Sequence, residues 1–317
     1  MKATIMDGKA LAEEIKAHIK DEVRLMKNEG IVPSLVTILV GDDQASKIYI
    51  RSKHKACHDV GISSRNVEVP DSTSSKDLST MIAELNEDRK VHGILIQMPL
   101  PNHIDSFDAI CSLSPDKDVD GLHPWNMGSI SYKRDELAPC TPKGILALLA
   151  KYKIEIAGKH VVVINRSTLV GRPISSLLRT INYLPPPSSG TDMTFLNQDA
   201  TVTTCHSKTV DLLKHIRDAD ILISAVGTRP EFTVTDKMVK SESVIIDVAM
   251  NRVQGNLCGD VDFERVIEKA SYITPVPGGV GPMTVAMLLH NTIIAASKIN
   301  KYELSYNTEE MLSSIGG

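Results

Sequence analysis

Residues 160–173 read HVVVINRSTLVGRP, and this stretch decides the fold. An apolar, β-branched run predicts a buried strand, a polar turn follows, and Gly171 and Pro173 mark the start of a helix. The N-terminus of such a helix offers free N–H groups and a positive dipole end to an anion such as a diphosphate. The turn is not a complete Gly-x-Gly-x-x-Gly motif, and an ordinary strand-to-helix turn remains open as its explanation.

The alternation of strands and helices continues toward the C-terminus. Strands are predicted at 200–205, 220–225, 243–248 and 271–274, and helices at 173–181 and near 208–217. A series of this kind is typical of a doubly wound, Rossmann-like parallel sheet. Three consecutive prolines within 182–198 exclude a helix there, and we interpret this segment as an inserted surface loop.

The N-terminal half has the same alternation. Helices are predicted at 8–29, 45–60 and 75–88, and strands at 34–40, 65–69 and 92–97. Residues 99–142 are predicted to form long loops around a short helix at 107–113, and further helices are predicted at 142–151 and 282–299. The polar residues after Ile299 are expected to fray. The whole pattern predicts an α/β protein with parallel sheets covered by helices.

Composition narrows the class of protein. The 317 residues suit one large domain or two ordinary ones, and a net charge of −4 with 4% aromatic residues makes nucleic acid an unexpected partner. The five cysteines are scattered without a Cys-x-x-Cys pair, which predicts reduced thiols and no metal site. We identify no apolar run of about 18 residues and no signal segment, so we expect no membrane partner and a cytoplasmic location.

The turn after the second strand of the C-terminal series indicates the type of nucleotide. An acidic residue there is usual for NAD, but this chain has His206-Ser207-Lys208-Thr209. Together with Arg166, these residues would form a cationic, hydroxyl-bearing site for a 2′-phosphate, which favours NADP. Alternatively, Lys208 simply begins a solvated helix. Asp260, in a later turn, is expected only to stabilise that turn.

Candidate reactive residues lie in the N-terminal half. Tyr49 and Lys53 are spaced i, i+4 and share one helix face, and Gln97 ends a buried strand. Asp116, Asp118 and Asp120 lie in one loop that lacks the spacing of an EF-hand. Each of these features also has an ordinary structural explanation, namely a surface contact, a cap or a solvated loop. Residues 275–284, PVPGGVGPMT, fix a tight backbone that then enters a helix.

Several of these stretches occur together in one known family. They are Tyr49-x-x-x-Lys53, Gln97-Met98-Pro99-Leu100-Pro101, Asp118-Val119-Asp120-Gly121, Arg166-Ser167-x-x-Val170-Gly171-x-Pro173, His206-Ser207-Lys208-Thr209 and Pro275–Thr284. In this order, over residues 7–299, the chain resembles the bifunctional methylenetetrahydrofolate dehydrogenase/methenyltetrahydrofolate cyclohydrolase family.

The resemblance implies a two-lobed α/β protein with a cleft between the lobes. Residues 1–143 and 282–317 would form the folate-binding lobe, and residues 144–281 the Rossmann-like NADP-binding domain with the insertion at 182–198. The implied enzyme is an oxidoreductase and hydrolase of one-carbon metabolism that acts on tetrahydrofolate derivatives. The resemblance further implies a homodimer that serves purine biosynthesis.

The resemblance also implies roles for particular residues. Lys53 would be catalytic, Gln97 would orient it, Tyr49 would pack on the folate and Asp120 would bind the pterin ring. The implied substrate site is Tyr49, Lys53, Ile96, Gln97, Met98, Asp120, Pro277, Gly278, Gly279, Val280 and Gly281. The implied NADP site is Asn165, Arg166, Ser167, Val170, Gly171, Ser207, Lys208, Gly227, Met250 and Thr284.

The two implied reactions need different groups. Hydride transfer from the methylene carbon depends mainly on positioning, whereas hydrolysis needs a proton carrier, and a lysine carries a proton only if it is partly neutral. The chain departs from the family at Asn165, where glycine is usual, and at Ala249-Met250, where Gly-Ile is common. A single-activity, NAD-linked dehydrogenase and a non-enzymatic folate or nucleotide sensor therefore stay open as alternatives.

Overall fold

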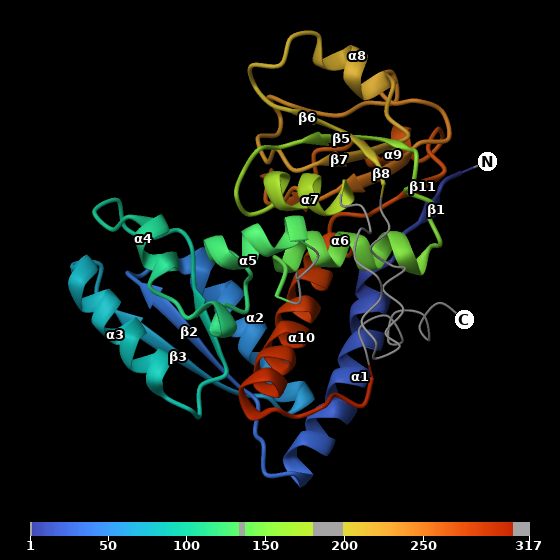
Figure 1. The fold of residues 1–317 in the computed structure, drawn as a ribbon. Helices are drawn as coiled ribbons and strands as arrows, with labels where there is room; N and C mark the ends of the chain where they lie inside the picture. Colours follow the sequence, from blue (N-terminus) through green and yellow to red (C-terminus); the bar gives the residue numbers. More distant parts are fainter. Residues whose placement is uncertain (1, 133–136, 180–198, 307–317) are drawn as a thin grey trace. The chain divides into compact units, whose positions relative to one another are not determined.

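A computed structural model of the protein describes residues 2–132, 137–179 and 199–306 (Figure 1). The expected insertion at 182–198 and the last eleven positions, 307–317, lie outside the described residues. The described residues group into two compact units. One contains the N-terminal residues through Glu13 together with Thr141–Thr284, and the other contains Glu14–Cys140 and Val285–Tyr306. We name them the six-stranded unit and the three-stranded unit after their sheets.

The six-stranded unit is built on a parallel sheet. Its strands, in spatial order, are β1 (Thr4–Ile5), β11 (Tyr272–Ile273), β8 (Val244–Asp247), β7 (Ile221–Ser224), β5 (His160–Ile164) and β6 (Thr201–Cys205). From β5 onward, the order 2-1-3-4-5 is that of a doubly wound sheet, as predicted. The helices of this unit include α7 (Gly171–Leu178), α8 (Leu212–Arg217) and α9 (Phe263–Val266). Alternate strand residues, such as Val162 and Leu222, share one core with Ile216 of α8 and Val266 of α9.

Two predicted helices of this unit begin elsewhere. α7 begins at Gly171, so Pro173 is its third residue rather than its first. α8 begins only at Leu212, because the residues after β6 form a turn in which the His206 N–H donates to Thr209 Oγ1. The prediction missed β1, α9 and the hairpin of β9 (Asn251–Val253) and β10 (Asn256–Cys258). These elements have two to four residues, too few to show a period.

The three-stranded unit contains a second parallel sheet in the order β3 (Ser63–Val69), β2 (Ser34–Val40), β4 (Gly93–Ile96). Its helices include α2 (Gln44–Val60), α3 (Ser75–Glu87), α4 (Ser106–Cys111) and α5 (Pro124–Ser129), and the short 3-10 helices η1 (Pro115–Lys117) and η2 (Ile130–Tyr132). The helices α1 (Gly8–Asn28), α6 (Cys140–Lys151) and α10 (Val280–Asn300) complete the fold. β2 is central and buried from Leu35 to Val40, and its Val36 and Ile38 pack against Leu78 and Ile82 of α3.

Helix α10 is the most apolar helix of the described chain. By length and composition it could cross a membrane, contrary to our reading that no apolar stretch is long enough. However, 72% of its most apolar window is buried inside the protein, and a core helix passes the same test. Within the three-stranded unit, Asn291 of α10 is fully buried and donates to Val119 O and Ala138 O, both at 3.0 Å. Asn291 therefore ties the helix to two loop segments.

The residues after α10 are docked rather than frayed as far as Tyr306. The carboxylate of Glu22 on α1 is buried and accepts the Ser305 N–H at 3.2 Å and the Ser305 hydroxyl. The Tyr306 ring lies against His18 and His290. The sequence suggested fraying because these residues are polar, but a buried acceptor on a distant helix compensates for that polarity.

We expect Asn291→Ala to lower the free energy of unfolding by about 1–3 kcal/mol, because it leaves two buried carbonyls without their donor. Urea denaturation measures this loss. Asn28→Ala, at the exposed end of α1, is the control and should stay within about 0.5 kcal/mol of the parent protein. Equal effects of the two substitutions would contradict the role given to Asn291.

Candidate active site

Lys53 and Gln97 meet in the three-stranded unit. The Lys53 ammonium on α2 donates to Gln97 Oε1 at 3.1 Å. Gln97 directly follows β4, its N–H donates to Ile38 O, and its Nε2 donates to Met98 O at 2.7 Å. The second bond holds the amide so that its oxygen faces the lysine. The structure thus joins two residues that lie 44 positions apart in the chain.

The neighbours of Lys53 differ in their exposure. Tyr49, one helical turn earlier, is 44% exposed, whereas Ile96 is 5% exposed and its side chain belongs to the hydrophobic core. His54 shares a hydrogen bond of 2.9 Å with Ser64. Burial lowers the pKa of His54, and the nearby Lys53 ammonium lowers it further. A neutral imidazole therefore adjoins Lys53 at physiological pH.

The two aspartates Asp118 and Asp120 of the loop at 115–122, the aspartate loop, have different surroundings. Asp118 is 1% exposed and accepts hydrogen bonds from the Gly121 N–H, the His123 N–H and Asn126 Nδ2 at 2.7–3.1 Å. Burial raises the pKa of Asp118. Asp120 is half-buried, and within the described residues its carboxylate receives no hydrogen bond or ion pair.

Two further contacts fix this loop. The buried Lys117 ammonium donates to Leu85 O, Asn86 O and Asp88 O at the end of α3, which uses all three of its N–H bonds. Gly121 has a φ of 75°, and a Cβ there would lie 2.4 Å from Leu137 O. Only glycine fits, so the backbone beside Asp120 is held in a single path.

The stretch 275–284 belongs to the six-stranded unit, whereas Lys53 and the aspartate loop belong to the three-stranded unit. Val280 and Gly281 are already the first residues of α10, and the Val280 side chain is buried. A Cβ on Gly8 would lie 2.0 Å from Gly279 O, and the Lys9 N–H donates to Gly278 O at 2.8 Å. The loop is therefore shaped by a contact with the N-terminal residues that its own sequence does not indicate.

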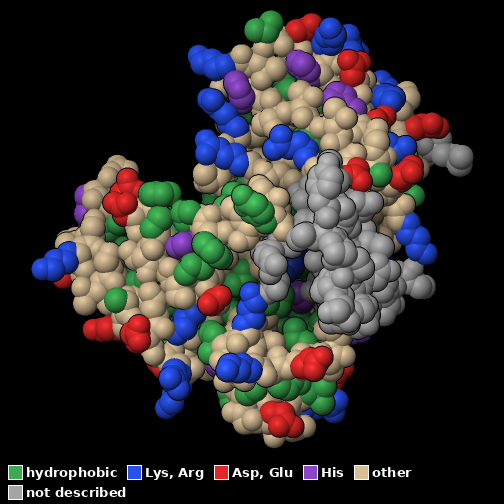
Figure 2. All heavy atoms as spheres, viewed as in Figure 1, with side chains coloured by type: hydrophobic (Ala, Val, Ile, Leu, Met, Phe, Trp, Pro, Cys, Tyr) green, Lys and Arg blue, Asp and Glu red, His purple; other side chains and the backbone are tan. Residues whose placement is uncertain are grey.

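The basic residues predicted for a 2′-phosphate emerge from neighbouring strands. Ile164 of β5 pairs with Cys205 of β6, so Arg166 and Ser207 each follow that register by two residues. Arg166, Ser207 and Lys208 are exposed at the carboxyl edge of the sheet. Figure 2 shows Lys and Arg side chains gathered on this part of the six-stranded unit, where Figure 1 places β6, α7 and α8. The arrangement fits the 2′-phosphate of NADP.

The start of α7 differs from the prediction of free N–H groups. The Gly171 N–H donates to Asn165 Oδ1 at 3.1 Å, the Arg172 N–H donates to Ser167 O, and Pro173 has no N–H. The Val170 N–H donates to Ser167 Oγ. A diphosphate at this edge would therefore meet a turn whose first helical donors are already engaged. Asn165 is one cause of this difference, because its side-chain oxygen accepts the Gly171 N–H.

Two buried aspartates organise the ends of β7 and β8. Asp247 accepts the N–H groups of Ala249, Asp260 and Val261 at 2.8–3.2 Å. Asp260 is fully buried and accepts Ser224 Oγ, the N–H groups of Val226 and Gly227, and Asn251 Nδ2. Asp260 thus connects three segments and does more than stabilise its own turn.

The two remaining residues of the implied NADP site are placed differently. Met250 is 45% exposed. The Thr284 hydroxyl is 2.8 Å from Thr141 Oγ1, so it already has a partner.

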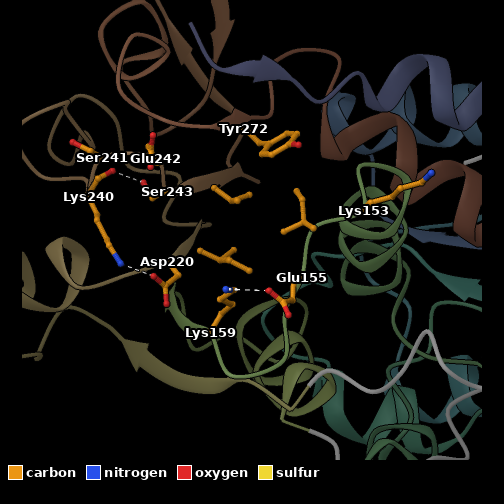
Figure 3. A pocket seen from close by; sticks show the side chains of 12 residues that line it. Lys153, Glu155, Lys159, Asp220, Lys240, Ser241, Glu242, Ser243 and Tyr272 are labelled. Carbon is orange, nitrogen blue, oxygen red and sulfur yellow. Dashed lines mark hydrogen bonds and ion pairs between the residues drawn. The ribbon is translucent and has the colours of Figure 1, made fainter. Parts of the chain in front are cut away.

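A hollow of about 400 Å³ lies at the opposite edge of the same sheet (Figure 3). It is lined by residues at the amino ends of β5, β7, β8 and β11, including Lys159, Asp220, Val244 and Tyr272. Its charges are largely paired, Lys159 with Glu155 and Lys240 with Asp220. Ligands of parallel α/β sheets bind at the carboxyl ends of the strands, so this hollow is not the nucleotide site. Among the residues that the structure describes, no cluster of His, Cys, Asp or Glu could hold a metal ion.

Comparison with known proteins decides the family. A model described as the tetrahydrofolate dehydrogenase/cyclohydrolase catalytic domain matches residues 6–120, and the NAD(P)-binding domain of the same family matches residues 139–300. The chain belongs to the tetrahydrofolate dehydrogenase/cyclohydrolase family.

Individual relatives agree over nearly the whole length. The "Bifunctional protein FolD" of Nitrosopumilus maritimus is 47% identical over 94% of this chain and 98% of its own length. The crystal structure of the bifunctional FolD enzyme from Campylobacter jejuni is 43% identical, with a TM-score of 0.85 over 93% of this chain and 99% of its own. The FolD structure from Trypanosoma brucei, complexed with NADP cofactor and inhibitor, is 35% identical, with a TM-score of 0.83 over 94% and 98%.

Several supporting residues of this dehydrogenase/cyclohydrolase were missed by sequence reasoning. Lys117, Asp247 and Asn251 are buried polar residues that hold loops at strand ends, and Asp118, named above only as a candidate reactive residue, has the same structural role. The available signal was position, since Asp247 directly follows an apolar run and Asp118 follows a basic residue within a loop. Burial itself could not be inferred, because it depends on segments distant in the chain.

We expect Asp247 to make stability depend on pH. Burial, and then the nearby Asp260, raise the pKa of Asp247 from 3.8 to about 6, so its protonated form is favoured in the folded state. The raised pKa of Asp247 therefore adds about 3 kcal/mol to the free energy of unfolding below pH 4, and this stabilisation is lost as the pH rises through 6. Asp247→Asn should remove this slope even though it weakens the fold overall. Parallel pH profiles of unfolding free energy for parent and variant would contradict the assignment.

Proposed function

We propose that this chain oxidises 5,10-methylenetetrahydrofolate to the methenyl form with NADP and then hydrolyses the methenyl form to 10-formyltetrahydrofolate. Membership of the family and the bifunctional relatives of nearly equal length support both activities. The Lys53–Gln97 hydrogen bond carries the proposal, because a protein that only bound folate would not need an oriented proton carrier.

Lys53 serves the hydrolytic step. Water adds to the methenyl carbon and gives one proton to the neutral amine of Lys53, and a ring nitrogen of the folate takes up a proton when its C–N bond breaks. Gln97 accepts a hydrogen bond from Lys53 and so directs the amine without adding charge. The methenyl substrate is itself a cation, and a positive charge beside an amine favours the neutral form that can accept this proton.

Asp120 binds the pterin ring. A pterin presents adjacent N–H donors, and a carboxylate accepts two of them at once. The half-buried carboxylate of Asp120 can accept these two hydrogen bonds, whereas the oxygens of Asp118 already accept N–H groups of its own loop. Tyr49, exposed on the same helix as Lys53, supplies an aromatic face for the folate. We assign Met98 and the 277–281 loop to the same substrate.

NADP, when bound, supplies the acceptor for the hydride. Arg166, Ser207 and Lys208 hold its 2′-phosphate, because they are exposed together at the carboxyl edge of β5 and β6. Gly227, with a φ of 72°, lets the nucleotide approach the backbone after β7. Ser167, Val170, Gly171, Met250 and Thr284 complete the proposed site.

A cytoplasmic homodimer that serves purine biosynthesis, with neither nucleic acid nor membrane as partner, is the setting we propose. All five cysteines are free thiols, and burial raises the pKa of Cys57 to about 12, so this thiol is unreactive. Free, unreactive thiols suit a reducing compartment. Light scattering of the purified chain tests the dimer.

An NAD-linked, single-activity dehydrogenase is the second candidate, and Asn165 is the observation that favours it. Its side chain accepts the Ser167 and Gly171 N–H groups and so alters the turn that would meet the nucleotide, although NAD and NADP carry the same diphosphate. Comparison of kcat/KM for NAD and NADP distinguishes the two candidates. Higher efficiency with NAD would overturn the proposed cofactor.

We expect Lys53→Met to lower cyclohydrolase activity at least about 100-fold, because it removes the proton carrier. Hydrolysis of methenyltetrahydrofolate, followed by its absorbance, measures this loss. Lys55→Met, an exposed lysine on the same helix, is the control and should retain parental activity. Hydrolysis at the parental rate in Lys53→Met would refute the assignment.

We expect substitutions of Asp118 and Asp120 to have different effects, one on stability and the other on folate binding. Asp120→Asn should raise the KM for folate about tenfold or more while thermal stability stays unchanged, because it weakens only the pterin contact. Asp118→Asn should instead lower the free energy of unfolding by about 1–3 kcal/mol, because an amide replaces the carboxyl group that accepts three hydrogen bonds. Steady-state kinetics and urea denaturation of both variants decide, and a reversed pattern counts against the division.

A further inference from the structure

The turn Ala225-Val226-Gly227 after β7 is held from two sides. On one side, Asn165 Nδ2 donates to Ala225 O at 2.5 Å. On the other, the N–H groups of Val226 and Gly227 donate to the two carboxylate oxygens of Asp260, at 2.8 and 3.0 Å. Three consecutive residues are thus fixed by two side chains from different parts of the sequence.

This turn lies where the sheet reverses its direction of growth. β5 is the first strand of the doubly wound series, with β6 on one side of it and β7 on the other. The crevice of such a sheet opens between the carboxyl ends of its first and third strands. Asn165 directly follows β5 and reaches the residue directly after β7, so its side chain spans this switch point.

Asn165 also fixes the opposite wall of that crevice. Its Oδ1 accepts the Ser167 N–H at 2.7 Å and the Gly171 N–H at 3.1 Å, so one amide joins the β5–α7 turn to the β7 turn. A Cβ on Gly171 would lie 2.2 Å from Asn165 O, which shows how closely the turn wraps this residue. Glycine at position 165 could make none of the three side-chain bonds.

Asp260 supports the Ala225-Val226-Gly227 turn from the protein interior. It is fully buried, and its partners Ser224 Oγ and Asn251 Nδ2 anchor it to β7 and to β9. The exposed surface of the crevice therefore rests on a carboxylate that no ligand reaches.

We propose that Asn165 and Asp260 are positioning residues that set the two walls of the NADP crevice before the nucleotide binds. The inference rests on the proposed function, because it assumes that NADP occupies the carboxyl edge of this sheet. Preorganised walls reduce the ordering cost of binding, so their loss weakens NADP and leaves the folate chemistry of the three-stranded unit unchanged.

The test uses the full chain with Asn165→Gly and Asn165→Ala. We expect the KM for NADP to rise about tenfold, the size of one or two lost net hydrogen bonds. Cyclohydrolase activity, assayed without NADP, should stay within twofold of the parent. A merely structural role would reduce both activities together. An unchanged or lowered KM for NADP would overturn the inference, and a lowered KM would show that Asn165 competes with the diphosphate.

Two further variants complete the experiment. Ser243→Ala removes a buried hydroxyl that bonds Lys240 O at the amino edge of the same sheet, and it should leave the KM for NADP unchanged. Asp260→Asn should raise that KM with cyclohydrolase retained, and if it does not fold, the Asn165 variants still decide. A parent protein without NADP-dependent dehydrogenase activity would refute the proposed function instead, which keeps the two failures distinct.

Discussion

A carboxylate that is removed from water and held by backbone N–H groups is the interaction on which the candidate site depends. Asp118 holds the aspartate loop in this way, and Asp247 and Asp260 hold the ends of β7 and β8. Such a group is costly to bury unless nearly all its acceptor positions are used, so each one fixes several backbone segments at once. The loops that line the proposed sites are consequently rigid without secondary structure of their own.

The buried and the exposed polar residues have separate tasks. Residues proposed to touch folate or NADP, such as Tyr49, Asp120 and Arg166, are exposed or half-buried. Their neighbours, such as Asp118 and Asp260, are buried and satisfied within the protein. Gln97 joins the two groups, because one end of its amide is fixed to the backbone and the other faces Lys53. The half-buried carboxylate of Asp120 is thus kept for a ligand, while Asp118 and Asp260 are satisfied within the protein.

The sequence predicted the parts of the fold that have a period or a clear stop. Ser34–Val40 was recognised as a strand because it is mostly apolar, and α2 ends at Val60 with Gly61, which has a φ of 84°, as its C-cap. The start of α7 was wrong by two residues, because Asn165 caps a turn that proline seemed to begin. Lys53, Gln97 and Asp120 were predicted as site residues from local motifs, and the structure shows the first two hydrogen-bonded to each other. The contacts of Asp260 and Asp247 with other segments and the docking of Ser305 on Glu22 could not be predicted, because the partners are remote in sequence.

The contact between Gly8 and Gly279 affects how the chain is assembled during its synthesis. A Cβ on Gly8 would lie 2.0 Å from the Gly279 carbonyl, and β1 pairs only with β11 in the sheet. The edge strand β1 therefore stays unpaired until β11, which follows it much later in the chain, has emerged from the ribosome. Until then β8 presents an open edge and β1 has no partner, a state in which chains are prone to wrong association. This sheet is therefore completed only after β11 has been made.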